Sequence, residues 1–370
     1  MALAGIIISE ATGTTQALGD LLNPPMHFIE VAQIHHEMGA AARIHATEGG
    51  FFLATRDAMR FHNADGAETF RHGHTMFNPT LFGRGEYAAI LEQGGRIFNV
   101  YNAQGLMYSI VVERPIVRFA LGAQGFSAVI MDGGSGIHDI QIYDNFGTMF
   151  YYGRHFDENI LPMTMDISHD GRVLAISYLD INDAQMNSFI SFVSIDGSVI
   201  GADDIIAENR QNPGQIVGPM HFLADGSLVV MSDTRIFVLN SSANVTWEKE
   251  LDNRVTHIEF ADSWFAVAYG DTMLNREGVA PGTIVGHNAF GVQLFSHTTL
   301  GRVMHMQTQG ANLVVGCGEG RFAAISNNGQ VLWEQILPGS VRDVGMLGSP
   351  NNVAVLSPTQ TDVLRRVRDN

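Results

Sequence analysis

Residues Ile140–Gly153 read IQIYDNFGTMFYYG. Apolar and polar residues alternate as far as Tyr143, the segment Asp144–Gly147 has the chemistry of a turn, and an apolar and aromatic run follows. Alternation with a period of two beside a glycine-containing turn predicts a β-hairpin. Because a lone hairpin cannot bury one of its faces, this segment indicates a fold only if the chain repeats it.

The hairpin pattern does recur along the chain. Its clearest copies are Met59–Phe70 (MRFHNADGAETF), Ile97–Ile110 (IFNVYNAQGLMYSI) and Ile140–Phe150 (IQIYDNFGTMF). Looser copies lie at Phe192–Ile200, Ile236–Trp247, Val292–Val303 and Phe322–Trp333. The turn glycines of the first four copies are 39, 42 and 50 residues apart, at Gly66, Gly105, Gly147 and Gly197. Self-similarity at this spacing predicts a repeat architecture.

A second pair of strands lies between successive hairpins. Its first strand ends in a short polar or glycine turn, such as His169–Gly171, and its second strand is almost continuously apolar, as in Val173–Ser177. Eight such units can be counted. A continuous apolar run of this length indicates a strand that is covered on both faces.

These units predict an all-β fold, a single β-propeller of four-stranded antiparallel blades over residues 26–370, after a weakly structured segment at 1–25. We expect eight blades, or seven if the region Val292–Thr308 is one unit rather than two. The last unit, Ser340–Val367, supplies only three strands. We expect Met26–Ile34 to supply the fourth strand and close the ring, which removes an exposed edge.

Composition excludes several classes of function. The formal net charge is −17 and Lys249 is the only lysine, which argues against binding the phosphate backbone of a nucleic acid. Cys317 is the only cysteine, so neither a disulfide framework nor a cysteine-rich zinc site is expected. No run of 18 apolar residues is present, and we expect no membrane span and a monomeric protein.

Long connections suggest an interaction surface. Four of them, Asp132–His138, Asp180–Asn187, Asp203–Pro213 and Asp271–Ala289, are expected on one face of the ring. Loops on a rigid scaffold often carry binding residues, although variation in loop length explains the same pattern. The candidate interaction residues are Asp132, His138, Asp180, Asp183, Asp271, Arg276 and His287.

No catalytic, cofactor or metal site is expected. His72 and His74 can lie on one side of a strand, but no third ligand is spaced to complete a metal site. The residues Asp180–Asp183 do not follow an EF-hand series. Gly316–Gly320 joins two strands, whereas a phosphate-binding loop leads into a helix. The triad motif G-x-S-x-G is absent from the sequence.

Several stretches resemble known propeller families. Asn327–Trp333 (NNGQVLW) is similar to the tryptophan-docking repeat of quinoprotein-like propellers, and Ala243–Trp247 keeps the tryptophan without the glycine. Ser168–Ser177 (SHDGRVLAIS) resembles a turn common among WD40-like propellers, but no tryptophan is followed by aspartate. Phe51–Val367 as a whole resembles a family of uncharacterised bacterial, largely Firmicute, propeller proteins.

That resemblance rests on IQIYDNFGTMF, MDISHDGRVLAISYLD and GSLVVMSDTRIFVLN. It implies a location outside the cytoplasmic membrane behind an N-terminal anchor. This sequence shows no complete anchor, so a cytoplasmic location is the alternative. We expect a non-enzymatic scaffold that binds an unknown protein or small ligand. The alternatives are a quinoprotein-like cofactor-binding enzyme and a module that senses small ligands or glycans.

Overall fold

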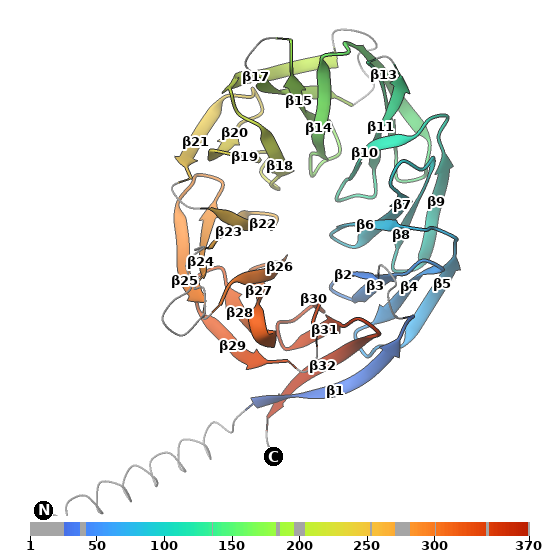
Figure 1. Cartoon of the computed structure of the whole chain (residues 1–370). Coiled ribbons are helices and arrows are strands. Elements are labelled where there is room, and N and C mark those ends of the chain that lie inside the picture. Colours follow the sequence, from blue (N-terminus) through green and yellow to red (C-terminus); the bar gives the residue numbers. More distant parts are fainter. Residues whose placement is uncertain are drawn as a thin grey trace, which may run out of the picture.

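The chain forms eight four-stranded antiparallel sheets arranged in a ring (Figure 1). The computed structural model describes residues 26–37, 42–134, 136–182, 186–195, 204–251, 254–270, 282–299, 301–337 and 340–368. Within these residues, no helix has the length and apolar character needed to cross a membrane. A 3-10 turn, Gly318–Gly320, lies between two strands.

Each sheet is one blade, and its strands are called A to D in chain order. Blades 1 and 2 consist of β2 (Arg43–Ala46), β3 (Gly50–Ala54), β4 (Ala58–Asn63) and β5 (Glu68–Gly73), and of β6 (Pro79–Arg84), β7 (Tyr87–Glu92), β8 (Ile97–Asn102) and β9 (Gly105–Val111). Blades 3 and 4 consist of β10 (Ile116–Leu121), β11 (Ser127–Gly134), β12 (Ile137–Tyr143) and β13 (Met149–Phe156), and of β14 (Ile160–Ile167), β15 (Val173–Asp180), β16 (Asn187–Ser194) and β17 (Ile205–Pro213).

The second half of the ring repeats this plan. Blades 5 and 6 consist of β18 (Val217–Phe222), β19 (Leu228–Ser232), β20 (Arg235–Leu239) and β21 (Val245–Glu250), and of β22 (Val255–Phe260), β23 (Trp264–Gly270), β24 (Gly282–Asn288) and β25 (Gln293–Thr299). Blades 7 and 8 consist of β26 (Val303–Gln309), β27 (Asn312–Cys317), β28 (Arg321–Ser326) and β29 (Val331–Ile336), and of β30 (Asp343–Met346), β31 (Asn352–Leu356), β32 (Gln360–Arg368) and β1 (Met26–His35).

The ring is closed by the strand nearest the N-terminus. The A strands lie nearest the axis and the D strands form the outer rim (Figure 1). In blade 8, strand β1 takes the D position and pairs antiparallel with β32, from Met26 opposite Arg368 to His35 opposite Gln360. The predicted eight blades and their closure are therefore confirmed, and the seven-bladed alternative is wrong.

The core lies between neighbouring blades. Every residue of the B strand β3 is buried, as the apolar runs predict. One apolar cluster joins Val314 and Phe322 of blade 7 to Val344 and Val355 of blade 8. Burying an aliphatic or aromatic side chain of this size stabilises the fold by about 1.5–3 kcal/mol. Each blade thus depends on its neighbours for the cover of its faces.

The hairpin Ile140–Gly153 forms the outer half of blade 3, from β12 into β13. The carboxylate of Asp144 organises its turn, because Oδ1 accepts hydrogen bonds from the amides of Phe146 and Thr148 at 2.9 and 2.8 Å. Gly147 has a φ of 80°, and a Cβ atom there would lie 2.8 Å from Cβ of Tyr108 in blade 2. The glycine therefore allows both the turn and the close approach of the neighbouring blade 2.

The same turn recurs with asparagine in the role of Asp144. The equivalent residues are Asn63, Asn240 and Asn288. Ala243, with a φ of 57°, takes the place of the glycine in blade 5. A shared turn chemistry explains why the hairpins were visible in the sequence.

One D-strand position docks an aromatic ring against the next blade. Strand register places an aromatic residue there in six blades, namely Phe70, Tyr108, Tyr151, Trp247, Phe295 and Trp333. The indole Nε1 of Trp333 donates to the carbonyl of Pro350 at 2.6 Å. The hydroxyl of Tyr108 donates to the carbonyl of Gly125 at 2.8 Å. The two tryptophans that resemble a docking repeat thus occupy an architectural position.

Blade 4 differs from the sequence-based prediction. Asp203–Pro213 was expected to be a connection, but β17 occupies Ile205–Pro213. This D strand is polar and mostly exposed because it forms the outer rim, so its sequence lacks an apolar run. The hairpin expected at Phe192–Ile200 has its first strand in β16, and its expected turn glycine, Gly197, lies outside the described residues.

Candidate functional site

The two faces of the ring carry different connections. Because neighbouring strands are antiparallel, the A–B and C–D connections emerge on one face, called the A–B face. The B–C and D–A connections emerge on the other face, called the B–C face. Of the four long connections expected, those of blades 3, 4 and 6 join B to C strands and therefore share the B–C face.

Asp132 and His138 lie in strands rather than in a loop. They face each other in the register of β11 and β12, and Oδ1 of Asp132 accepts a hydrogen bond from the amide of Gly134 at 2.8 Å. This contact shapes the local turn. The pair therefore has a structural role in blade 3.

Asp180 is the last residue of strand β15, and its side chain stabilises the connection that follows this strand. Its Oδ1 accepts hydrogen bonds from the backbone amide and the side chain of Asn182, both at 2.9 Å. Asp183 lies outside the described residues. Within the described residues, no three His, Cys, Asp or Glu side chains form a group that could hold a metal ion.

The insert of blade 6 is shorter than expected. Strand β24 starts at Gly282, whereas the sequence suggested a loop as far as Ala289. His287 is therefore a strand residue, only 4% exposed, and its ring stacks on Phe265 with the centroids 5.6 Å apart. The prediction that it lies in a loop is therefore wrong. Asp271 and Arg276 lie outside the described residues.

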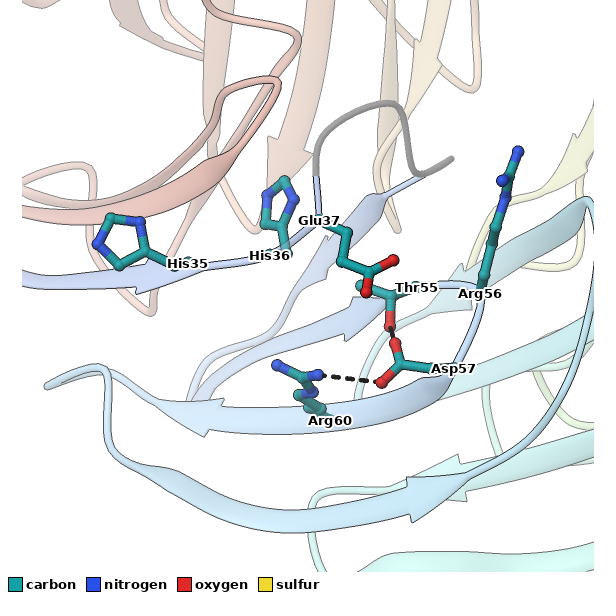
Figure 2. A pocket seen from close by; sticks show the side chains of 7 residues that line it. All are labelled: His35, His36, Glu37, Thr55, Arg56, Asp57 and Arg60. Carbon is teal, nitrogen blue, oxygen red and sulfur yellow. Dashed lines mark hydrogen bonds and ion pairs between the residues drawn. The ribbon is translucent and has the colours of Figure 1, made fainter.

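A pocket of about 340 Å³ opens on the B–C face between blades 8 and 1. The end of β1 provides His35–Glu37, and blade 1 provides Thr55–Asp57 and Arg60 (Figure 2). The hydroxyl of Thr55 donates to Asp57 at 2.6 Å, which is the main reason that the pKa of this carboxyl lies below its ordinary value. Arg60 and Arg71 also pair with Asp57. The carboxylate is thus already neutralised by the protein.

A larger cavity of about 460 Å³ opens on the A–B face around the axis. The A strands supply its wall, including His45, Arg84, His221, Glu259 and Gln307. The A–B turns supply its rim, which includes Glu48, Glu86, Ala123, His169 and Asp262. An axial cavity with convergent polar groups is the default position for a binding site on a rigid scaffold.

Side chains at one A-strand position link neighbouring blades around this cavity. Asp166 accepts a hydrogen bond from the amide of Phe222 at 2.7 Å, Gln307 from Met346 at 3.0 Å, and Glu259 from Thr308 at 3.4 Å. In each case the donor belongs to the A strand of the next blade. These polar side chains therefore hold neighbouring blades together and also form part of the cavity wall.

Arg84 spans from blade 2 to blades 4 and 5. Its Nη1 lies 2.7 and 2.9 Å from the carboxylate oxygens of Asp166, and its Nη2 donates to the carbonyl of Phe222 at 3.1 Å. Nη1 also lies 3.0 Å from Nδ1 of His221. The ion pair is largely buried, so it forms a fixed wall on one side of the cavity.

Burial determines the protonation states of three other wall residues, Glu259, His221 and His45. It raises the pKa of the Glu259 carboxyl to about 8 and lowers the pKa of the His221 ring to about 4. It also lowers the pKa of His45, whose Nε2 lies 2.8 Å from the carbonyl of Gly85. Near neutral pH these three side chains are therefore mainly uncharged.

Sequence reasoning did not identify the axial cavity. The long loops predicted an interaction surface on the B–C face. The residues of the axial cavity lie instead on strands and on short turns of the A–B face. A usable signal exists, because alignment of the repeats places polar residues at one A-strand position, namely His45, Asp166, His221, Glu259 and Gln307. Polar residues at inward positions of apolar units indicate a shared polar interior.

Comparison with known proteins identifies a family, and the description of that family states no activity. The family model that matches residues 28–365 is described as a family of unknown function, DUF5711. The chain belongs to this family. No curated protein matches the sequence. For a DUF5711 chain, the fold and the cavity are therefore the basis for any functional argument.

Solved structures agree with the DUF5711 chain in fold alone. BamB from Moraxella catarrhalis is 13% identical with a TM-score of 0.54, and the match covers 92% of this chain and 98% of BamB. The computationally designed Ika8 protein is 14% identical with a TM-score of 0.59, over 91% and 99% of the two chains. Saccharomyces cerevisiae Sqt1 is 10% identical with a TM-score of 0.53, over 91% and 100%.

Proposed function

We propose that this DUF5711 propeller is a non-enzymatic binding scaffold that holds a small ligand in the axial cavity of the A–B face. The observation that carries the proposal is a cavity of about 460 Å³ whose wall is fixed by the Arg84–Asp166 ion pair and by inter-blade hydrogen bonds. A wall held in this way is pre-organised, which lowers the free-energy cost of ordering the site on binding.

A thermal-shift screen with a variant that fills the cavity tests the proposal. The probes are libraries of small organic cations, anions, amino acids and sugars. We expect at least one class to raise the Tm of the wild type, since a ligand of the native state must stabilise it. Ala123→Trp fills the cavity from the turn of blade 3 and should abolish that shift.

Gln104→Trp is the matched control, because Gln104 lies at an exposed C–D turn position where Phe146 and Phe290 already place aromatic rings in other blades. It should keep the ligand-induced shift. A shift that survives Ala123→Trp unchanged, or no shift with any library, would contradict the proposed site.

A second candidate function is protein binding at the B–C face. Phe77, Val111 and Ile336 lie at D–A connections on this face and are 78%, 72% and 70% exposed. Ile181 and Met186 are also exposed and flank the B–C connection of blade 4. These exposed apolar side chains offer contacts to a protein partner, as Phe146 and Phe290 do on the A–B face.

Chemical cross-linking in cells tests this second candidate. Val111→Ser with Ile336→Ser should reduce cross-linked partner by at least tenfold, and replacement of residues 271–281 by a short Gly-Ser linker tests the insert separately. The control is Phe146→Ser with Phe290→Ser on the opposite face. Equal partner recovery from all variants would remove the B–C face from consideration.

We also propose the absence of a cofactor-dependent activity. The aromatic D-strand position has an architectural role, and the described residues contain no metal-binding group of three or more side chains. Addition of pyrroloquinoline quinone with calcium should leave the Tm unchanged. A clear rise in Tm would instead favour the quinoprotein-like alternative.

The cellular location and the monomeric state remain proposals as well. The family resemblance supports a site outside the cytoplasmic membrane. Protease added to intact cells should degrade an epitope-tagged chain if this is correct, and should spare it if the chain is cytoplasmic. Light scattering of the purified protein should give the mass of one chain.

A further inference from the structure

The rim of the axial cavity is acidic. Glu48, Glu86 and Asp262 contribute carboxylates from the A–B turns of blades 1, 2 and 6. Among the described lining residues, Arg84 is the only arginine or lysine, and its guanidinium is already paired with Asp166. The cavity thus offers no free cation to an anionic ligand. Its potential favours a positive charge.

Glu259 differs from Asp139 and Asp166, two other carboxyl groups in the protein interior, and shares with Asp343 a pKa that burial raises. Asp139 is paired with Arg154 and lies near Arg114, and Asp166 is paired with Arg84. Within the described part of the chain, Glu259 has no ion pair, and its hydrogen bonds come from the side chain and the backbone amide of Thr308, the amide nitrogen lying 3.4 Å from Oε1. Buried carboxylates usually have a cationic partner, and among the described residues Glu259 has none.

The neighbours of Glu259 cannot supply that partner. The ring of His221 stacks on Phe260 at 4.9 Å and stays uncharged because burial lowers its pKa. Asp343, from the A strand of blade 8, acts on Glu259 as a further negative charge. Phe260 and Tyr87 also line the cavity, and aromatic rings attract organic cations.

We propose that the axial cavity binds a small organic cation, an ammonium or guanidinium compound, and that Glu259 is its anionic partner. This inference rests on the proposed ligand-binding function and gives the chemical class of the ligand. The cation donates to the Glu259 carboxylate, the acidic rim screens out anions, and the aromatic rings contact the apolar part of the ligand. Arg84 bounds another side of the cavity, where its charge is already neutralised by Asp166.

Binding is coupled to proton release. The empty cavity holds Glu259 mainly protonated at neutral pH, since its pKa is about 8, and a bound cation favours the carboxylate. Affinity therefore rises about tenfold from pH 6 to pH 7 and levels off above about pH 8. The other titratable or charged groups that line the cavity or act on Glu259 are His45 on β2, Arg84 on β6, Tyr87 on β7, His221 on β18, Asp343 on β30, and Glu48, Glu86, His169 and Asp262 at the rim.

Isothermal titration calorimetry with agmatine tests the class of ligand. Agmatine carries an ammonium and a guanidinium group, and 1,4-butanediol and succinate serve as its neutral and anionic counterparts. We expect agmatine alone to bind, with the pH dependence above, and with a heat that varies with the ionisation enthalpy of the buffer. Glu259→Gln should weaken binding at pH 8 by at least tenfold and abolish the proton release.

Glu259→Gln keeps a neutral side chain of the same shape, so it can retain the link to Thr308 as Gln307 retains its link to Met346. The control Glu113→Gln makes the same change of charge at an exposed site on the B–C face and should bind agmatine as the wild type does. Unaltered agmatine binding in Glu259→Gln would overturn the role of this residue.

The outcomes also separate this inference from the proposed function. If succinate or butanediol binds and Ala123→Trp prevents it, while agmatine does not bind, the cavity is a ligand site but the cation is the wrong class. If neither these probes nor the libraries bind in a manner sensitive to Ala123→Trp, both proposals are wrong.

Discussion

Arg84 connects blade 2 with blades 4 and 5 across the axial cavity. Its guanidinium neutralises the largely buried Asp166 in another blade. Arg84→Met should leave that carboxylate without a cation and lower the free energy of unfolding by about 3–5 kcal/mol. Urea denaturation measures the loss, and the double variant Arg84→Met with Asp166→Asn should recover part of it. An equal loss in the single and double variants would show that packing, and not charge, dominates.

Glu259 gives the stability of the protein a pH dependence. Its pKa rises from 4.5 to about 8 on folding, so the folded state binds the proton more tightly. Its contribution is fully present below about pH 4.5 and is lost as the pH rises to about 8. The free energy of unfolding of the wild type, relative to Glu259→Gln, should therefore fall by up to about 1.4 kcal/mol per pH unit in this window.

Urea denaturation at pH 5, 6.5 and 8 measures this difference. The control Glu113→Gln should follow the wild type at every pH. Parallel curves for the wild type and Glu259→Gln would mean that the carboxyl is solvated in the folded protein.

At this scale, the sequence indicated turns but not contacts across the ring. Asp144 and Gly147 are neighbours in the chain, and their local chemistry was sufficient to predict a turn. Arg84 and Asp166 are 82 residues apart, and their contact depends on how blades 2 to 4 curve around the axis. One sequence carries no direct record of that curvature.

Among the elements, the C–D hairpin of blade 3 depends on a glycine that the neighbouring blade requires. Gly147 and Gly226 have φ values of 80° and 85°, but a Cβ at Gly147 would meet Tyr108 whereas one at Gly226 would meet nothing within 4 Å. Both alanine variants should lose about 1 kcal/mol from backbone strain. Gly147→Ala should lose about 1–3 kcal/mol more from overpacking. Thermal denaturation of the two variants would show equal losses if the contact between blades were unimportant.

The elements also show where a sequence pattern is informative. Apolar B strands were evident because both of their faces are covered, as in β3. Strand β17 was missed because its exposed rim position imposes no apolar alternation. His287 was assigned to a loop, yet it lies buried in β24, since a histidine that stacks on Phe265 cannot be told from a surface histidine by its letter alone. An exposed outer strand and a buried polar residue are therefore two positions where the sequence pattern misleads.

For the whole molecule, the repeat predicted both the number of blades and the means of closure. The three-stranded last unit and the extra strand at Met26 together account for one blade. The repeat did not indicate which face binds a ligand. Long loops show where the fold tolerates insertions, and they do not show where a cavity lies. The axial cavity exists only when eight A strands converge.

Ring closure by β1 gives a prediction that belongs to the complete ring. Strand β1 covers the edge of β32, and Phe28 contacts Trp333 of blade 7 with the ring centroids 5.1 Å apart. Removal of residues 1–35 leaves a three-stranded blade 8 with an open edge, so we expect a Tm lower by at least 10 °C and concentration-dependent association through β32. Removal of residues 1–25 keeps β1 and should leave both properties close to those of the full chain. A monomer of unchanged Tm after removal of residues 1–35 would mean that the seven complete blades and the rest of blade 8 hold the ring without its closing strand.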